Sequence, residues 1–184
     1  RDNQNYSAFV MGLRREARER AVQFLFQYDL NPGEEKDLAV NLNQFWHTHK
    51  LSESGYEKGN ATWGKKIELS DTTTRDTSIR VFAEDLIRGV LDKKEELDLK
   101  LQKYLRNWDL TRMAVVDRNV LRMAIFELYY REDIPPVVSL NEAIEIAKRF
   151  STRESGKFVN GLLDRIRQDI LRPARTPLKN SNPS

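Results

Sequence analysis

Cysteine is absent from the 184 residues of the chain, and histidine is scarce, with only His47 and His49 present. The protein therefore has no disulfide framework, no thiolate nucleophile and no cysteine-bound zinc. The two histidines have no evident third ligand, so they do not predict a metal site. A transmembrane run and an apolar signal region are also missing, and this favours the cytoplasm.

Signatures of catalysis are missing as well. The chain has no phosphate-binding glycine loop of the Walker type. Its carboxylates, such as Asp164 and Asp169, stand at spacings that are ordinary for solvated helix faces, so no general acid–base pair can be singled out. We therefore predict no catalytic residue, no cofactor and no enzymatic activity.

Charge of one sign is not in large excess, although charged residues make up 32% of the chain. Lysine and arginine number 31 against 28 aspartate and glutamate residues, which leaves a net charge of +3. Any affinity for a polyanion must therefore come from local patches rather than from the overall field. The hydrophobic fraction of 39% is enough for one sizeable core, in a single domain or in two small, tightly packed halves.

The spacing of apolar residues is helical nearly everywhere and predicts an all-α fold, apart from one short strand-like step at 137–138. Two S-x-x-E capping boxes, Ser139 with Glu142 and Ser151 with Glu154, mark the predicted starts of the last two helices. The other predicted helices cover about 13–29, a segment around 38–46, 78–105, a short helix opened by Trp108-Asp109-Leu110, and 117–131.

Three stretches lack this helical pattern. Residues 1–12 are predicted to be a flexible N-terminal extension, and residues 172–184 a disordered basic tail. The stretch 51–76 is rich in Ser, Gly, Thr and Asn, a composition that predicts a long loop or an insertion.

The first helix begins with the segment LRREARERAVQFLFQY, in which Arg14, Arg15 and Arg18 precede mostly apolar residues. At 100° per residue, Arg15 and Arg18 share an arc with Phe26, next to the predicted core face. A basic cluster beside an aromatic ring suits single-stranded nucleic acid, because phosphates take the charge while a base stacks on the ring. The alternative is that Arg15 pairs with Glu19 and that Phe26 belongs to the core.

The last helix carries a predicted buried stripe and an unusual glycine. Phe158 lies at the edge of the stripe, beside Gly161 and Arg165. A glycine inside a helix costs about 1 kcal/mol relative to alanine, so we expect a close helix contact or a close ligand at Gly161. The stripe comprises Val159, Leu162, Leu163, Ile166 and Ile170.

The helix predicted over 117–131 is apolar on two sides. Such a helix is either central to its bundle or covered by another chain. One stripe comprises Val120, Leu121, Ala124 and Leu128, and the other comprises Met123, Phe126 and Tyr130.

Three segments of the chain resemble the NusB family of bacterial transcription antitermination factors: ARERAVQFLFQ, VVDRNVLRMAIFELYYREDIPPVVSLNEAIEIAKRF and ESGKFVNGLLDRI. The resemblance implies one helical domain over 13–171, built from two three-helix bundles of about 13–106 and 107–171. It also implies a protein without catalysis that supports ribosomal RNA transcription. Such a protein binds single-stranded boxA RNA together with NusE, a small-subunit ribosomal protein that doubles as an elongation factor.

The resemblance further implies two sets of site residues. It assigns RNA binding to Arg14, Arg15, Arg18, Phe26, Glu154, Lys157 and Phe158. It places NusE near Met123, Phe126 and Tyr130, with Asp117, Arg118 and Arg122 on the exposed flank of the same helix. The chain departs from the family pattern at Glu16, at Phe26, where a tyrosine is frequent, and in the length of 31–76. Whether the protein also forms a homodimer stays open.

Two other functions compete with this interpretation. A NusB-like module could serve another RNA task, as in the domain ahead of the catalytic part of some ribosomal RNA cytosine methyltransferases. The chain has no room for such a catalytic part before Ser184, which argues against that role. The other alternative is a structural helical scaffold whose basic helix is merely solvated, and a gel-shift titration with single-stranded RNA separates it from the first two.

Overall fold

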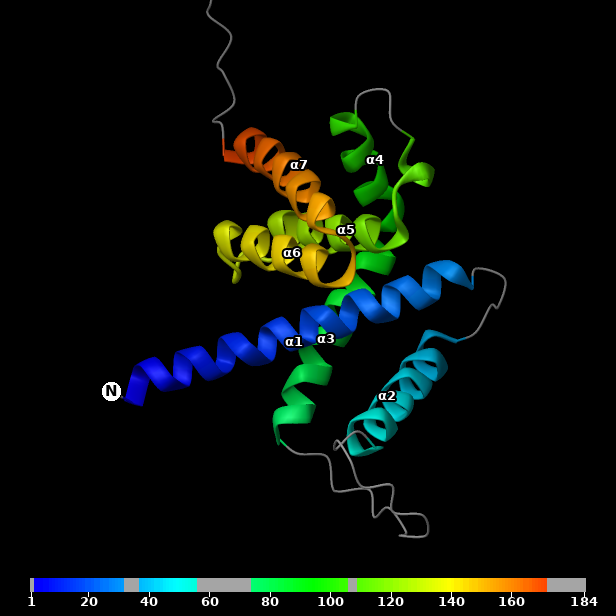
Figure 1. The fold of residues 1–184 in the computed structure, drawn as a ribbon, viewed down its shortest axis with the longest axis vertical. Helices are drawn as coiled ribbons and strands as arrows, with labels where there is room; N and C mark the ends of the chain where they lie inside the picture. Colours follow the sequence, from blue (N-terminus) through cyan, green and yellow to red (C-terminus); the bar gives the residue numbers. More distant parts are fainter. Residues whose placement is uncertain (1, 32–36, 56–73, 106–108, 172–184) are drawn as a thin grey trace, which may run out of the picture. The chain divides into compact units, whose positions relative to one another are not determined.

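The computed structural model describes residues 2–31, 37–55, 74–105 and 109–171. These ranges contain helices and no strand, which confirms the predicted all-α fold. No helix among them is long and apolar enough to cross a membrane. In chain order (Figure 1), the elements are α1 (Asp2–Leu30), α2 (Leu38–Gly55), α3 (Thr74–Asp92), α4 (Lys94–Tyr104), the 3-10 helix η1 (Leu110–Arg112), α5 (Val115–Tyr130), α6 (Pro136–Phe150) and α7 (Arg153–Leu171).

The observed helices differ from the predicted ones mainly at their ends. Helix α1 begins at Asp2, within the predicted extension, and α2 continues to Gly55, within the predicted loop. The helix predicted over 78–105 is two helices, α3 and α4, which meet at Lys93. No proline marks this break, so the apolar pattern could not reveal it. Most of the predicted loop, together with the predicted tail, lies outside the described residues.

The start of α6 corrects two predictions. The step at 137–138 is helical, because Pro136 occupies the first position of α6, where the fixed φ of proline favours a helix. Ser139 is therefore already inside the helix and cannot cap it. Its hydroxyl instead donates a buried hydrogen bond of 2.5 Å to a carboxylate oxygen of Glu127 in α5.

The start of α7 corrects a third prediction, the capping box at Ser151. The hydroxyl oxygen of Thr152 accepts a hydrogen bond from the backbone N–H of Ser155 at 3.1 Å, as a helix cap does. The capping residue is therefore one position later than predicted. The Ser151 hydroxyl lies 2.9 Å from that of Ser155 and joins the same polar group.

The chain divides into two units, Arg1–Lys94 and Glu95–Ser184, with the division at the start of α4 rather than near residue 106. In unit 1, α1 packs against α3, and Ala17, Ala21 and Ala83 are fully buried. Alanine at these positions lets helix backbones approach closely. Helix α2 adds an aromatic contact in which the Phe45 and Phe24 rings meet edge to face, with centroids 5.4 Å apart.

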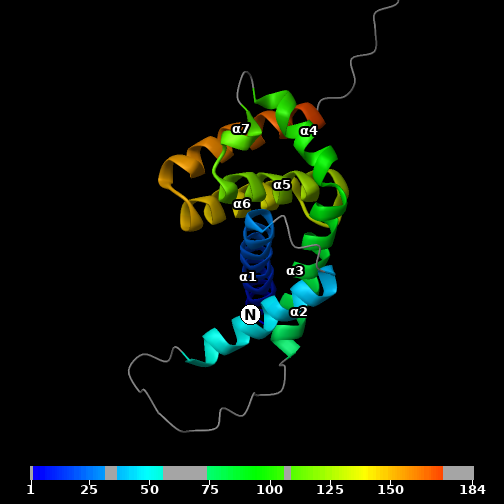
Figure 2. The ribbon, with the colours of Figure 1, turned by 90° about the vertical axis from the view of Figure 1, so that its right-hand side faces the viewer.

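Unit 2 is organised around α5, which packs against both α6 and α7 (Figure 2). Met123 and Phe126, from the second apolar stripe, are only 1% and 8% exposed within this one chain. This burial supports the interpretation of α5 as the central helix of its group. Tyr130, from the same stripe, is 36% exposed.

Candidate nucleic-acid interface

The arginines at the start of α1 do not share one environment. The guanidinium carbons of Arg14 and Arg18 each lie 5.3 Å from the centroid of the Phe82 ring in α3. Arg14 remains exposed, but Arg18 is only 2% exposed. Arg18 was expected next to the core face, on one arc with Arg15 and Phe26, but α3 covers it and it belongs to the core. Arg18 contributes a cation–π contact to the interior of unit 1.

Arg15 and Phe26 lie on one side of α1, about three turns apart. The Arg15 side chain is exposed, and Phe26 is half-buried, so part of its ring is accessible. Glu16, which interrupts the run of arginines, is paired with Arg75 of α3 at 2.8 Å. A second pairing, with Arg20, is longer at 3.8 Å. These partners offset the negative charge of Glu16, so it weakens the basic character of this segment less than the sequence suggests.

The residues predicted on α7 form an exposed side of that helix. Glu154 and Lys157 are exposed, and Phe158 is half-buried. Gly161 lies on the same side, and a Cβ there would meet no heavy atom of a described residue within 4 Å. Of the two explanations expected for Gly161, a close helix contact is therefore wrong.

The close helix contact occurs instead at Gly156, which no pattern in the sequence marks. A Cβ on Gly156 would lie 2.6 Å from Cγ of Lys148 in α6. The missing side chain therefore lets the Lys148 stem cross α7. A single sequence carries no signal for this, because the contact joins two helices. The crossing lies in a groove of about 390 Å³, lined by Asn141, Ile144, Glu145, Lys148, Gly156, Lys157 and Asn160.

The prediction that Asp117, Arg118 and Arg122 form an exposed flank of α5 is wrong for two of these three residues. Asp117 is 6% exposed, and one of its carboxylate oxygens accepts a hydrogen bond of 2.8 Å from the Ser155 hydroxyl at the start of α7. Arg122 is 4% exposed and donates two hydrogen bonds of 2.7 Å to the carboxylate of Asp98 in α4. Both side chains are turned inward, because α7 covers Asp117 and α4 covers Arg122. Arg118 is half-buried.

The aromatic surface of unit 2 is instead a tyrosine patch formed by Tyr104, Tyr129 and Tyr130. The last two are 39% and 36% exposed. The Nζ atom of Lys100 lies 4.6 Å from the Tyr129 ring centroid, and the Tyr130 hydroxyl donates a 2.5 Å hydrogen bond to Glu96. Only Tyr130 was predicted. The other tyrosines come from α4 and the end of α5, which the sequence does not place together.

Two hydroxyls of the tyrosine patch have raised pKa values. Burial, followed by a hydrogen bond with Asp169, raises the pKa of Tyr104 to about 12. The hydrogen bond to Glu96, followed by burial, raises the pKa of Tyr130 to about 12. The raised pKa values keep both phenols protonated, and therefore able to donate hydrogen bonds, up to a higher pH than an ordinary tyrosine. Aromatic side chains with polar ends are enriched in protein interfaces.

The geometry thus provides a basic and aromatic side of α1 in unit 1, an exposed side of α7 in unit 2, and a tyrosine patch in unit 2. Among the described residues, no group of three or more His, Cys, Asp or Glu side chains could hold a metal ion. These features define an all-helical protein whose surfaces suit a nucleic-acid strand and a protein partner.

Comparison with known proteins agrees with this class. The model of the NusB family matches residues 15–168. The transcription antitermination protein NusB of Desulforapulum autotrophicum is 43% identical over 157 residues, which cover 85% of this chain and 92% of that protein. The NusB of Myxococcus xanthus is 40% identical over 163 residues, covering 89% of this chain and 100% of that protein. The chain belongs to the NusB family.

Solved structures show the same fold. The T. maritima NusB structure has a TM-score of 0.61 and 35% identity, and the match covers 85% of this chain and 91% of that one. A complex of the antitermination factors NusB and NusE with dsRNA contains a chain that matches with a TM-score of 0.63. At 22% identity, over 86% of this chain and 98% of that one, the second likeness concerns the fold alone.

Proposed function

We propose that this protein is a transcription antitermination factor that binds boxA-type single-stranded RNA together with NusE and acts by binding rather than by catalysis. Membership of the NusB family supports this function, because the curated relatives are named transcription antitermination proteins. The observation that carries the proposal is the exposed Arg15 on the same side of α1 as the accessible part of Phe26. Charge and ring together suit a phosphate and an unstacked base.

Within unit 1, the three arginines have different roles in this proposal. Arg15 binds phosphate directly, and Arg14 does so from its place over the Phe82 ring. Arg18 acts mainly as a positioning residue, because its buried guanidinium on the same ring holds α1 against α3. Phe26 stacks a base with the accessible part of its ring.

Within unit 2, Lys157 and Phe158 repeat this combination of charge and ring on α7. Gly161 leaves the surface of α7 open beside Lys157 and Phe158, so an RNA strand can approach the helix backbone closely. Glu154 repels phosphate, and its place in the first turn of α7 suits stabilisation of the helix start. Phe158→Ala is expected to weaken RNA binding by about 1–3 kcal/mol in a stacking role.

For NusE, we propose the tyrosine patch as the contact surface, together with the accessible part of Phe126. Met123 is 1% exposed and supports this surface from below. Asp117 and Arg122 support it indirectly, because their hydrogen bonds hold α5 to α7 and to α4. Arg118 is half-buried and remains a candidate contact at the edge of the surface.

RNA binding with and without purified NusE tests the proposed function. Fluorescence anisotropy with a labelled boxA-type RNA should show binding that NusE strengthens, whereas a scrambled RNA should bind more weakly. Arg15→Ala should weaken binding, and Arg112→Ala, which removes the same charge from an exposed position on η1, should not. Equal binding of both RNAs, or none of either, would favour the helical scaffold.

A further inference from the structure

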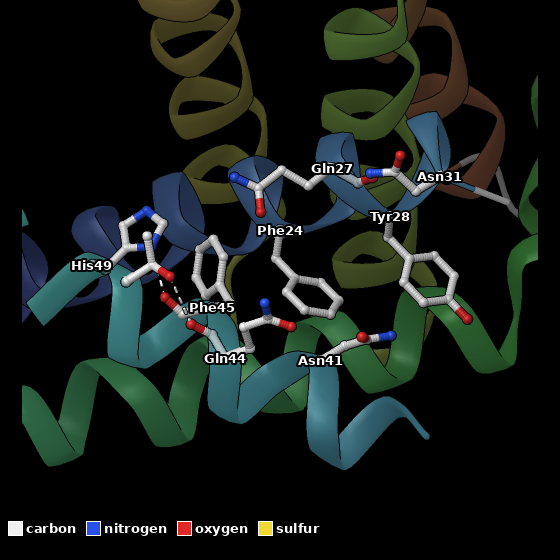
Figure 3. A pocket seen from close by; sticks show the side chains of 9 residues that line it. Phe24, Gln27, Tyr28, Asn31, Asn41, Gln44, Phe45 and His49 are labelled. Carbon is white, nitrogen blue, oxygen red and sulfur yellow. Dashed lines mark hydrogen bonds between the residues drawn. The ribbon is translucent and has the colours of Figure 1, made fainter. Parts of the chain in front are cut away.

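A pocket of about 270 Å³ lies between α1 and α2 of unit 1 (Figure 3). It plays no part in the surfaces described above. Its lining side chains carry aromatic rings, carboxamides and hydroxyls: Phe24, Gln27, Tyr28, Asn31, Asn41, Gln44, Phe45, Thr48 and His49.

Four rings form the floor and the ends of the pocket. Phe24 and Phe45 are 3% and 5% exposed, and Figure 3 shows them between Tyr28 at one end and His49 at the other. The Tyr28 ring stacks on Phe24 with centroids 5.9 Å apart, and the His49 ring centroid lies 3.9 Å from that of Phe45. The His49 Nδ1 also donates a hydrogen bond of 2.9 Å to the Phe45 carbonyl oxygen. The ends of the pocket are therefore held in place before any ligand binds.

Four carboxamides surround this aromatic floor. Asn31 Nδ2 donates to the carbonyl oxygen of Gln27 at 3.1 Å. Among the described residues, none donates to or accepts from the carboxamides of Gln27, Asn41 and Gln44. Asparagine is also a poor helix former, so Asn41 lowers the stability of α2 relative to a residue such as alanine. Each carboxamide offers two donors and one acceptor to a ligand.

The size and charge of the pocket limit its ligand. Its volume lies just below the range of about 300–1,000 Å³ that is typical for drug-sized ligands, so it suits a single flat ring system. No Asp, Glu, Lys or Arg side chain is among the described residues that line it, so this lining favours a neutral group. A nucleobase is a flat, neutral ring with donors and acceptors along its edge, and it meets these limits. Asparagine and glutamine pair with base edges, and unstacked bases stack on aromatic side chains.

We propose that this pocket binds one unstacked nucleobase, with Asn41, Gln44 and Gln27 reading its edge and Tyr28 or His49 stacking on its face. The pocket is separate from the proposed RNA surface of α1, since Gln27 lies about 120° around the helix from Arg15. The inference therefore does not depend on that surface. The base can belong to an RNA strand or to a free nucleotide, and both present the same edge and face.

The experiment uses the full chain and follows the side-chain NH2 signals of Asn41 and Gln44 by NMR. The four nucleoside 5′-monophosphates are titrated separately, with ribose 5-phosphate as the probe that lacks a base. We expect at least one nucleotide to shift these signals and ribose 5-phosphate to leave them unchanged. The double variant Asn41→Ala, Gln44→Ala should bind that nucleotide roughly tenfold more weakly, because two hydrogen bonds are lost.

The control variant is His47→Ala, which changes an exposed residue of α2 outside the pocket and should bind like the parent chain. Alanine favours a helix more than Asn or Gln, so the double variant should fold, as circular dichroism can verify. Equal responses to ribose 5-phosphate, or unchanged binding by the double variant, would overturn the proposal. A response to a neutral tripeptide but to no nucleotide would overturn it as well.

A titration with a short single-stranded RNA separates the two sources of the base. If the RNA shifts the side-chain NH2 signals of Asn41 and Gln44, the pocket binds a base of an RNA strand. If only mononucleotides shift these signals, the pocket binds a free nucleotide. Either result supports a base pocket. RNA binding by a chain whose pocket responds neither to the RNA nor to any mononucleotide would refute this proposal and leave the proposed function intact. If nucleotides shift the pocket signals of a chain that binds no RNA, the base pocket is supported and the proposed function is refuted.

Discussion

Replacing Arg18 should affect folding much more than replacing Arg15, although both arginines belong to the basic segment of α1. Arg18 is 2% exposed, and its guanidinium lies over the Phe82 ring. A desolvated cation–π contact contributes about 2 kcal/mol, and truncation of the buried stem adds a cavity. We therefore expect Arg18→Ala to lower the free energy of unfolding by about 2–4 kcal/mol. For a chain of this length, a loss of about 3 kcal/mol lowers the melting temperature by roughly 6–12 °C.

Arg15 is exposed, so Arg15→Ala should change the free energy of unfolding by no more than about 0.5 kcal/mol. Its effect should appear in RNA binding, where the loss of one phosphate contact removes roughly 0.7 from the slope of log K against log salt concentration. Urea denaturation measures the first quantity, and anisotropy titrations at several salt concentrations measure the second. Both measurements are needed for each variant, because a loss of folded protein would otherwise be taken for a loss of RNA affinity.

Two further variants separate charge from packing at Arg18. Arg18→Met keeps much of the apolar stem and removes the charge, and Arg18→Lys keeps the charge but loses the flat guanidinium that lies over Phe82. Both should unfold at urea concentrations between those of Arg18→Ala and the parent chain. A structural role of Arg18 is excluded if Arg18→Ala unfolds like the parent chain while its RNA binding weakens as much as that of Arg15→Ala.

Three other predictions follow from unit 2. Arg122→Ala leaves the half-buried Asp98 carboxylate without its bidentate partner and should cost about 2–3 kcal/mol of stability in urea denaturation, whereas a loss below about 0.5 kcal/mol would contradict the burial of Arg122. Gly161→Ala should raise stability by about 0.5–1 kcal/mol, since its Cβ meets nothing within 4 Å, and should weaken RNA binding; unchanged RNA binding would show that no strand approaches there. The pKa of Tyr130 is raised to about 12 from 10.0, so its hydrogen bond to Glu96 adds stability below pH 10 that is lost towards pH 12. Tyr130→Phe should reduce this loss in denaturation curves at increasing pH, and an identical pH dependence would exclude the contribution.

Much of the fold follows from local patterns. The helical period of the apolar residues predicted the all-α fold, and Pro135-Pro136 separated α5 from α6. Helix ends were less predictable. Thr152 rather than Ser151 caps α7, because the choice between neighbouring hydroxyls depends on backbone angles that residue types alone do not set.

The candidate site could be predicted in part. The family resemblance was confirmed, and the structure leaves Arg14, Arg15, Lys157 and Phe158 at least partly accessible. Their role in RNA binding stays a prediction. The tyrosine patch and the pocket between α1 and α2 were missed, since each gathers residues from two different helices, and the pattern of one helix does not show what its neighbour places opposite.

The sequence by itself determined the helical period, the balance of charge and the absence of thiol chemistry, because these depend on residue type and on near neighbours. Only the tertiary structure decided which faces are covered. A helical wheel gives the direction of a side chain but not what lies opposite. Arg18 is buried because α3 supplies Phe82, Arg122 because α4 supplies Asp98, and Gly161 is open because no described helix crosses it. Burial is a property of contacts between helices, and those contacts join residues far apart in the chain.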